Sequence, residues 1–250
     1  MQPLMIESLG HTATHSISKI LSSLDESYVQ HGKRNFNSKL SPHNKNFITQ
    51  NSNEYLSSMI EKTNSYKIVI SIHANWIASE IQKVCESKSI NFKYLIRDPL
   101  KQINSCYSKY INEIFDTNSL EILKLFPIVQ DKMESLDIPT TLPNFLYFHS
   151  FYYIIRNNIY NILSGVPCIK VEDLLSSKRS FIENLDLPKT LLDQSIDYFD
   201  KKPFKINQHS KKAKKIRLPK PDVDKIIRNT GIIYNGQSYD FDDYICLSGY

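Results

Sequence analysis

The stretch that most constrains the fold runs from Pro3 to Leu24, where a short apolar run is followed by a glycine and then by a helical pattern. Leu4, Met5 and Ile6 predict a buried strand, and Gly10 allows the chain to turn. Apolar residues then recur at helical spacing, at Ile17, Ile20, Leu21 and Leu24. This spacing predicts a helix packed back onto a sheet, and hence a strand-turn-helix unit.

The turn between this strand and this helix has the features of an anion site. Backbone N–H groups that open a helix have no partner within it, and the helix dipole places positive potential there. We therefore expect the N–H groups of residues 12–16, with the hydroxyls of Thr12, Thr14 and Ser16, to bind a phosphate or sulfate group. The alternative is an ordinary turn capped by Thr12 or Thr14. The G-x-x-x-x-G-K-[ST] pattern of nucleoside triphosphatases is absent.

Composition favours an ordinary globular protein. The 250 residues are 41% hydrophobic and 23% charged, which suits one large domain or two small ones. Residues 1–9 lack the basic start of a signal peptide and carry Glu7. The most apolar later stretch, Leu142–Leu163, contains His149 and Arg156 and predicts a core helix rather than a membrane span. The expectation is a soluble cytoplasmic protein with no membrane partner.

Cysteine and charge patterns narrow the ligand class. The four cysteines, Cys85, Cys106, Cys168 and Cys246, show no paired spacing, which predicts free thiols rather than a zinc site or disulfides. We expect no metal. The net charge of +5 is modest, and much of the excess lies between Lys201 and Lys220. A local basic cluster predicts one acidic ligand or substrate rather than a nucleic-acid surface.

Further strand patterns alternate with helical ones along the chain. Strands are predicted around Tyr28 and Val29 and in the ranges 67–73, 91–96 and 166–175. A helix is predicted to begin at Pro99, and others lie in the ranges 53–62, 75–87, 119–136, 142–163, 180–185, 189–199 and 222–229. This alternation predicts an α/β protein with a central parallel sheet flanked by helices. His73 ends one strand, and ligands bind at such ends in open sheets. A histidine that caps the next helix is the alternative.

Three features now follow one another along the chain: the anion-binding turn, the strand-final His73, and a strand followed by Arg97-Asp98-Pro99 with Ser105 eight residues after the arginine. In this order they resemble the sulfotransferases that use 3′-phosphoadenosine 5′-phosphosulfate (PAPS). The resemblance implies a P-loop-like sulfotransferase fold in a single domain over residues 1–250. Its core would span about residues 3–200, with the basic segment 201–250 closing over the cofactor.

The resemblance also implies site residues. In that family a K-[ST]-G-T-T-[WS] loop holds the 5′-phosphosulfate, and HTATHS stands in its place here. The implied cofactor loop is His11, Thr12, Ala13, Thr14, His15 and Ser16. Arg97 and Ser105 match the pair that grips the 3′-phosphate, and His73 matches a catalytic base. The sequence IKVEDLLS, residues 169–176, resembles the family's Y-E-D-L strand end.

Three loop positions depart from the family pattern. His11 replaces a lysine, Ala13 a glycine and His15 a threonine. The family's lysine neutralises charge on the bridging oxygen as the phosphosulfate bond breaks. A protonated His11 is one substitute, and Lys19 or Lys33 is another.

The C-terminal 3′-phosphate loop of the family, of R-K-G type, is not reproduced. Ser210, Lys211 and Lys212 are candidate replacements, and a solvated charge run is the alternative.

The functional hypothesis is transfer of a sulfuryl group from PAPS to a hydroxyl or amine of a small polar acceptor, with 3′-phosphoadenosine 5′-phosphate (PAP) as product. His73 would remove the acceptor proton and His11 would stabilise developing charge. Tyr28 and His31 are candidate acceptor-binding residues, and a polar natural product is one candidate acceptor. The alternatives are a nucleotide-dependent kinase and a non-catalytic descendant that binds a nucleotide or glycan.

Overall fold

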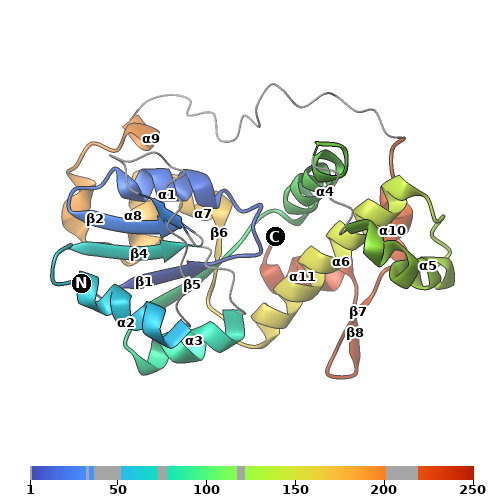
Figure 1. The fold of residues 1–250 in the computed structure, drawn as a ribbon, viewed down its shortest axis with the longest axis horizontal. Coiled ribbons are helices and arrows are strands. Elements are labelled where there is room, and N and C mark those ends of the chain that lie inside the picture. Colours follow the sequence, from blue (N-terminus) through green and yellow to red (C-terminus); the bar gives the residue numbers. More distant parts are fainter. Residues whose placement is uncertain (1, 32–33, 37–51, 73–77, 117–121, 201–218) are drawn as a thin grey trace. The chain divides into compact units, whose positions relative to one another are not determined.

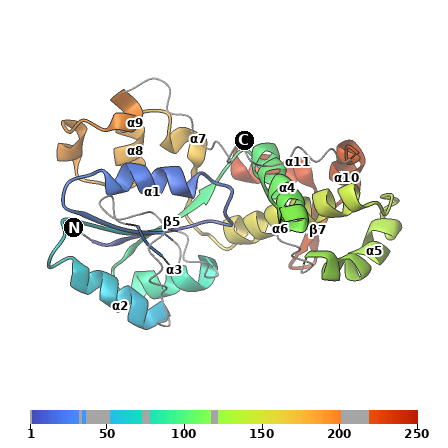
Figure 2. The ribbon, with the colours of Figure 1, turned by 45° about the horizontal axis from the view of Figure 1, so that its top comes forward.

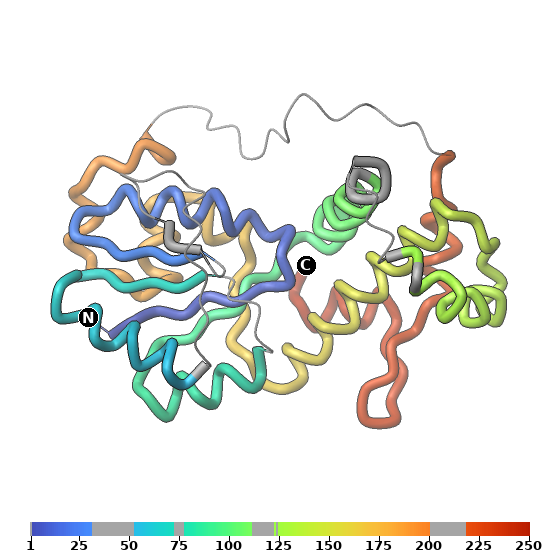
Figure 3. The backbone as a smooth tube through the Cα atoms, viewed as in Figure 1, coloured from blue at the N-terminus to red at the C-terminus, as the bar shows by residue number. Residues whose placement is uncertain are grey.

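A computed structural model describes residues 2–31, 34–36, 52–72, 78–116, 122–200 and 219–250 (Figure 3). His73, Lys33, Ser210, Lys211 and Lys212 lie outside these ranges, so their predicted roles stay predictions. The chain forms two compact units, which are described separately. Unit 1 comprises Met1–Arg97 and Ser164–Gln208, and unit 2 comprises Asp98–Leu163 and His209–Tyr250.

Unit 1 is built on a six-stranded sheet in the order β3-β2-β4-β1-β5-β6 (Figure 1). The strands are β1 (Leu4–Glu7), β2 (Ser27–His31), β3 (Arg34–Phe36), β4 (Ile68–Ile72), β5 (Asn91–Ile96) and β6 (Cys168–Lys170). All neighbours pair in parallel except β2 and β3, which are antiparallel. Both β1 and β4 are buried along their whole length, as expected for the middle of a parallel sheet.

Helices cover both faces of this sheet (Figure 2). One face carries α1 (Thr14–Ser22), α7 (Val171–Leu174), α8 (Lys178–Asn184) and α9 (Asp197–Asp200), and the other carries α2 (Ser52–Lys62) and α3 (Ala78–Ser87). Ile17 and Leu21 of α1 belong to one buried cluster with Ile6, Ile70 and Phe181. Each such side chain contributes roughly 1.5–3 kcal/mol by leaving water. The predicted α/β class, with a central parallel sheet flanked by helices, is confirmed.

The predicted strand and helices after residue 165 differ from the observed ones. Strand β6 ends at Lys170, and the V-E-D-L sequence forms the single turn α7 instead of continuing the strand. Glu172 and Asp173 then lie in the first turn of a helix, where carboxylates are favoured by the helix dipole. The predicted helix over 189–199 is divided between a 3₁₀ turn, η2 (Lys189–Leu192), and α9.

Unit 2 is organised around α6 (Leu142–Leu163). The helices packed on it are α4 (Pro99–Asp116), α5 (Phe126–Ser135), α10 (Val223–Asn229) and α11 (Phe241–Ser248), and a 3₁₀ turn, η1 (Ile122–Leu125), precedes α5. Within α6, the amide of the fully buried Asn158 donates to Tyr244 Oη at 3.0 Å and to Gln102 Oε1 at 3.3 Å. This network joins three helices, and α6 is the predicted core helix. None of the described helices is long and apolar enough to cross a membrane.

The end of the chain forms a hairpin followed by helix α11. Strands β7 (Ile232–Tyr234) and β8 (Gln237–Tyr239) form an antiparallel hairpin. Its turn residues, Asn235 and Gly236, have φ of 49° and 81°. An Asn-Gly pair is the usual sequence signal for such a turn, so the hairpin was predictable.

Candidate functional site

The topology of unit 1 indicates at which end of the parallel strands a ligand is expected to bind. From β1 the chain crosses to β2 on one side, whereas from β5 it continues to β6 on the other. Because β1 and β5 are neighbours, their carboxyl ends form a topological switch point, where α/β sheets bind their ligands. The loop of residues 8–13 follows the carboxyl end of β1, and Arg97 follows the carboxyl end of β5.

The loop has an unusual backbone. Gly10, His11 and Ala13 have positive φ, at 82°, 59° and 58°. This left-handed conformation is free of strain for glycine but costs on the order of 1–2 kcal/mol for other residues. Successive N–H groups in such turns form a concavity that binds anions. The loop thus contains left-handed residues of the kind that form such concavities, at a cost in conformational energy, although the Gly10 N–H already donates to Ser8 Oγ at 3.1 Å.

The first turn of α1 is not capped by a side chain. Ala13 is its N-cap residue, so the structure does not contain the turn capped by Thr12 or Thr14. One expectation needs correction, because the N–H of Ser16 is not available to a ligand: it donates to the Ala13 carbonyl at 2.9 Å. The Ser16 N–H is therefore part of the first hydrogen-bonded turn of α1.

Thr12 lies inside the loop with its side chain fully buried. Its Oγ1 has no hydrogen-bond partner within the part of the chain that the structure describes. A buried hydroxyl in this state costs about 1–3 kcal/mol, so a native structure that keeps one calls for an explanation. Because the hydroxyl has no exposed surface, a ligand oxygen would supply the missing partner only after the loop opens.

Arg97 connects the loop to the neighbouring strand. Its Nη1 donates to the His11 carbonyl at 3.1 Å, and its Nε lies 4.0 Å from Glu172 Oε1. The guanidinium therefore fixes the backbone of His11 while a quarter of the side chain remains exposed. Ser105 lies half-buried in α4 of unit 2, and its partnership with Arg97 stays a prediction.

Two histidines assigned to different sites meet in the structure. The His15 ring, on α1, lies 4.2 Å from the His31 ring, on β2, with the planes tilted by 32°. His15 is exposed and His31 is 8% exposed. His31, which was predicted to bind the acceptor, thus contacts His15, which was predicted to bind the cofactor.

Tyr28, the other predicted acceptor residue, lies apart from His31. Residues three apart on a strand point to opposite faces. The Tyr28 hydroxyl donates to Gln30 Oε1 at 3.0 Å, and its ring packs 5.4 Å from that of Tyr66. Burial raises the pKa of the Tyr28 hydroxyl. Tyr28 and His31 therefore do not form one contact surface.

Glu7 is a buried carboxylate that the site prediction did not include. It ends β1 and is 1% exposed. The charge of Glu7 also acts on the Cys85 thiol. The pKa of this thiol is raised to about 12, mainly by burial and to a smaller extent by Glu7. The sequence signal was a charged residue at the end of an apolar run, which is rarely tolerated in a core without a compensating interaction.

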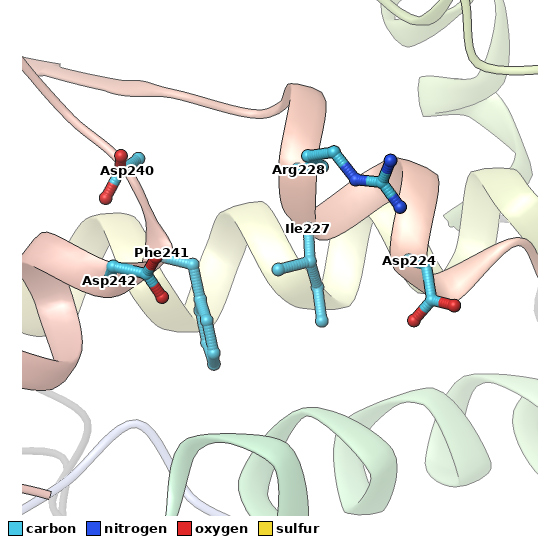
Figure 4. A pocket seen from close by; sticks show the side chains of 6 residues that line it. All are labelled: Asp224, Ile227, Arg228, Asp240, Phe241 and Asp242. Atoms are coloured by element: carbon cyan, nitrogen blue, oxygen red, sulfur yellow. The ribbon is translucent and has the colours of Figure 1, made fainter.

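A pocket of about 310 Å³ lies in unit 2 beside α10 and the start of α11 (Figure 4). Its lining residues are Asp224, Ile227, Arg228, Asp240, Phe241 and Asp242. Asp240 is the N-cap of α11 and forms a capping box with Asp243. With three carboxylates and one guanidinium, this pocket would repel a bisphosphate nucleotide. No group of three or more His, Cys, Asp or Glu residues suited to a metal ion occurs among the described residues.

The left-handed Ala13 gives a direct test of loop strain. We expect Ala13→Gly to raise the free energy of unfolding by about 1 kcal/mol, because glycine adopts this conformation without cost. Urea denaturation measures the change. Ala78→Gly, at the first residue of α3, is the control for the greater freedom of glycine in the unfolded chain and should lower stability. Equal effects of the two substitutions would show that Ala13 is not strained.

Comparison with known proteins gives one similar structure. No protein-family model matches the sequence, and no curated protein matches it. A solved sulfotransferase from Alicyclobacillus acidocaldarius aligns with a TM-score of 0.44 and 13% identity, over 79% of this chain and 87% of that one.

Proposed function

We propose that this protein is a sulfotransferase that moves a sulfuryl group from PAPS to a hydroxyl or amine of a small polar acceptor. The observation that carries the proposal is the left-handed loop after β1, with Arg97 bonded across it. Inside it lies the buried Thr12 hydroxyl, which has no hydrogen-bond partner in the part of the chain that the structure describes. Backbone donors, a hydroxyl and a guanidinium together suit the charged oxygens of a phosphosulfate nucleotide. The order of this loop, Arg97 and Ser105 along the sequence supports the same ligand.

The protein's side chains have distinct roles in this proposal. PAPS supplies the sulfuryl group, and the released product is PAP. The loop N–H groups, the Thr12 and Thr14 hydroxyls and His11 stabilise negative charge on the 5′ side of the nucleotide. Arg97 and Ser105 hold the 3′-phosphate, with Lys211 and Lys212 as further candidates. His73 takes the proton that the acceptor loses as its oxygen or nitrogen bonds to sulfur.

Replacing Thr12 with valine should change stability and binding in opposite directions. Valine keeps the shape but removes the unsatisfied hydroxyl, so we expect the free energy of unfolding to rise by about 1 kcal/mol. PAP affinity should fall about tenfold, the equivalent of one lost hydrogen bond to a charged group. Urea denaturation and calorimetry measure the two effects.

The matched control is Thr12→Ser, which keeps the hydroxyl and should retain PAP affinity. If valine lowers stability and leaves PAP affinity unchanged, the Thr12 hydroxyl is not a ligand donor.

Cleavage of ³⁵S-labelled PAPS tests the proposed reaction. The protein is incubated with labelled PAPS and a mixture of small hydroxyl and amine compounds, and all label that leaves PAPS is counted, whether it enters an acceptor or water. We expect wild-type protein to accelerate cleavage and Arg97→Ala to abolish the acceleration. Cleavage no faster than in buffer, despite bound PAP, would favour the non-catalytic alternative. Transfer of phosphate from labelled ATP instead would favour the kinase.

A further inference from the structure

The contact between His15 and His31 provides the loop with a side chain that gains charge when a ligand binds. We propose that this pair takes up one proton as a phosphate- or sulfate-bearing ligand binds the loop, and that His15 carries the resulting positive charge. His31 acts as a positioning residue for His15. The inference rests on the proposed function for the identity of the ligand. It assigns to His15 the positive charge first expected of His11, which then contributes to the site as a neutral hydrogen-bond donor.

The geometry identifies which of the two rings becomes charged. Their centroids are 4.2 Å apart, so two imidazolium ions would repel one another strongly and the pair carries at most one positive charge. Burial disfavours charge on His31, which is 8% exposed, whereas His15 is exposed to water. A charged His15 over the neutral His31 ring also gains a cation–π interaction.

The position of His15 on α1 links its charge to the ligand. It is the second residue of the helix, in the turn where the dipole places positive potential. When no anion is bound at the loop, this positive potential of the helix disfavours the protonated, positively charged form of His15. A bound anion reverses the local field and favours protonation. A second observation supports a ligand at this turn: the fully buried hydroxyl of Thr12 has no hydrogen-bond partner among the described residues.

Other charged groups lie on the elements packed around the pair. These are Lys19 one turn along α1, Glu7 at the end of β1, Arg97 bonded to the His11 carbonyl, and Arg34, whose backbone pairs with that of His31. His11 lies in the loop itself. Lysine and arginine side chains in general keep their charge between about pH 6 and about pH 8, whereas imidazoles titrate there. Glu7 and the phosphates of PAP, whose second pKa is about 6, can also exchange protons, so the loss of uptake in one histidine variant identifies the residue.

Calorimetric titration with PAP in buffers of different ionisation enthalpy measures the proton uptake. At about pH 7.5, above the ordinary imidazole pKa, we expect wild-type uptake to approach one proton per PAP. His15→Gln should abolish the uptake and lower affinity about tenfold at about pH 6.5. His31→Phe keeps a stacking ring and should keep the uptake, whereas His31→Ala should reduce it.

Three results would overturn the proposal: uptake that persists in His15→Gln, uptake that vanishes in His11→Gln instead, or binding with no uptake in the wild type. If wild-type protein does not bind PAP, the proposed function fails, and the titration is repeated with inorganic pyrophosphate. Uptake with pyrophosphate that is lost in His15→Gln would then support the histidine pair on its own. Its absence would overturn the pair as well.

Discussion

Replacing Arg97 with alanine is expected to lower the affinity for PAP by about 100-fold or more. A guanidinium that binds a phosphate contributes charge-assisted hydrogen bonds of about 1.5–3 kcal/mol each, and about 1.4 kcal/mol is a tenfold change in affinity. The substitution also removes the 3.1 Å bond to the His11 carbonyl, which fixes the loop backbone. Both effects weaken the same site.

Two variants make this result specific to the Arg97 side chain. Arg97→Lys keeps the charge without the planar fork and should bind PAP with intermediate affinity. Arg179→Ala, in α8 of the same unit, removes an exposed arginine paired with Glu183 and should bind PAP as the wild type does. Calorimetry compares the four proteins. An Arg97→Ala affinity within twofold of wild type would show that Arg97 does not contact the nucleotide.

The second large effect is expected at His73. General-base catalysis contributes about 10²- to 10⁴-fold, so His73→Gln should slow PAPS cleavage by this factor. PAP affinity should change little, because PAP has no acceptor proton to remove. The expectation rests on the sequence: His73 follows Ile72, the last residue of β4, which pairs with Ile6 of β1 and with His31 of β2. The strand before His73 thus ends beside the strand that carries the loop.

His149→Gln is the matched control for His73→Gln. His149 lies in α6 against the Tyr110 ring, at 5.4 Å, and burial lowers its pKa. Its replacement should leave PAPS cleavage by the folded protein close to the wild-type rate. A His73→Gln variant that cleaves PAPS normally would exclude this histidine as the base. Loss of PAP binding in that variant would instead assign His73 to the nucleotide site.

The elements at the centre of unit 1 were predictable from sequence because local and global preferences agree there. The β-branched run that forms β4 is buried on both faces. A strand in the middle of a parallel sheet is apolar on both faces, and the sequence shows this pattern. The start of α4 at Pro99 was predictable for a similar reason, since proline suits the first turn of a helix. Arg97 consequently lies where the sequence predicted, at the carboxyl end of β5.

The loop conformation was not predictable from residue preferences. Positive φ is uncommon for residues other than glycine, and for alanine more than for histidine. His11 and Ala13 nevertheless adopt it because the strand before them and the helix after them are fixed by packing. The contact between His15 and His31 depends on where β2 lies relative to α1, which is a tertiary property. The length of β6 also depends on its neighbour, because it pairs only with β5 among the described strands.

Calorimetric titration of the wild-type protein with PAP, alongside ATP with magnesium, tests the central claim most directly. The claim is that the loop after β1 and Arg97 together hold a 3′-phosphorylated adenine nucleotide. We expect PAP to bind with a dissociation constant on the order of micromolar, which corresponds to a binding free energy of about −8 kcal/mol. We expect ATP with magnesium to show no binding. No binding of PAP, or tighter binding of ATP with magnesium, would contradict the account.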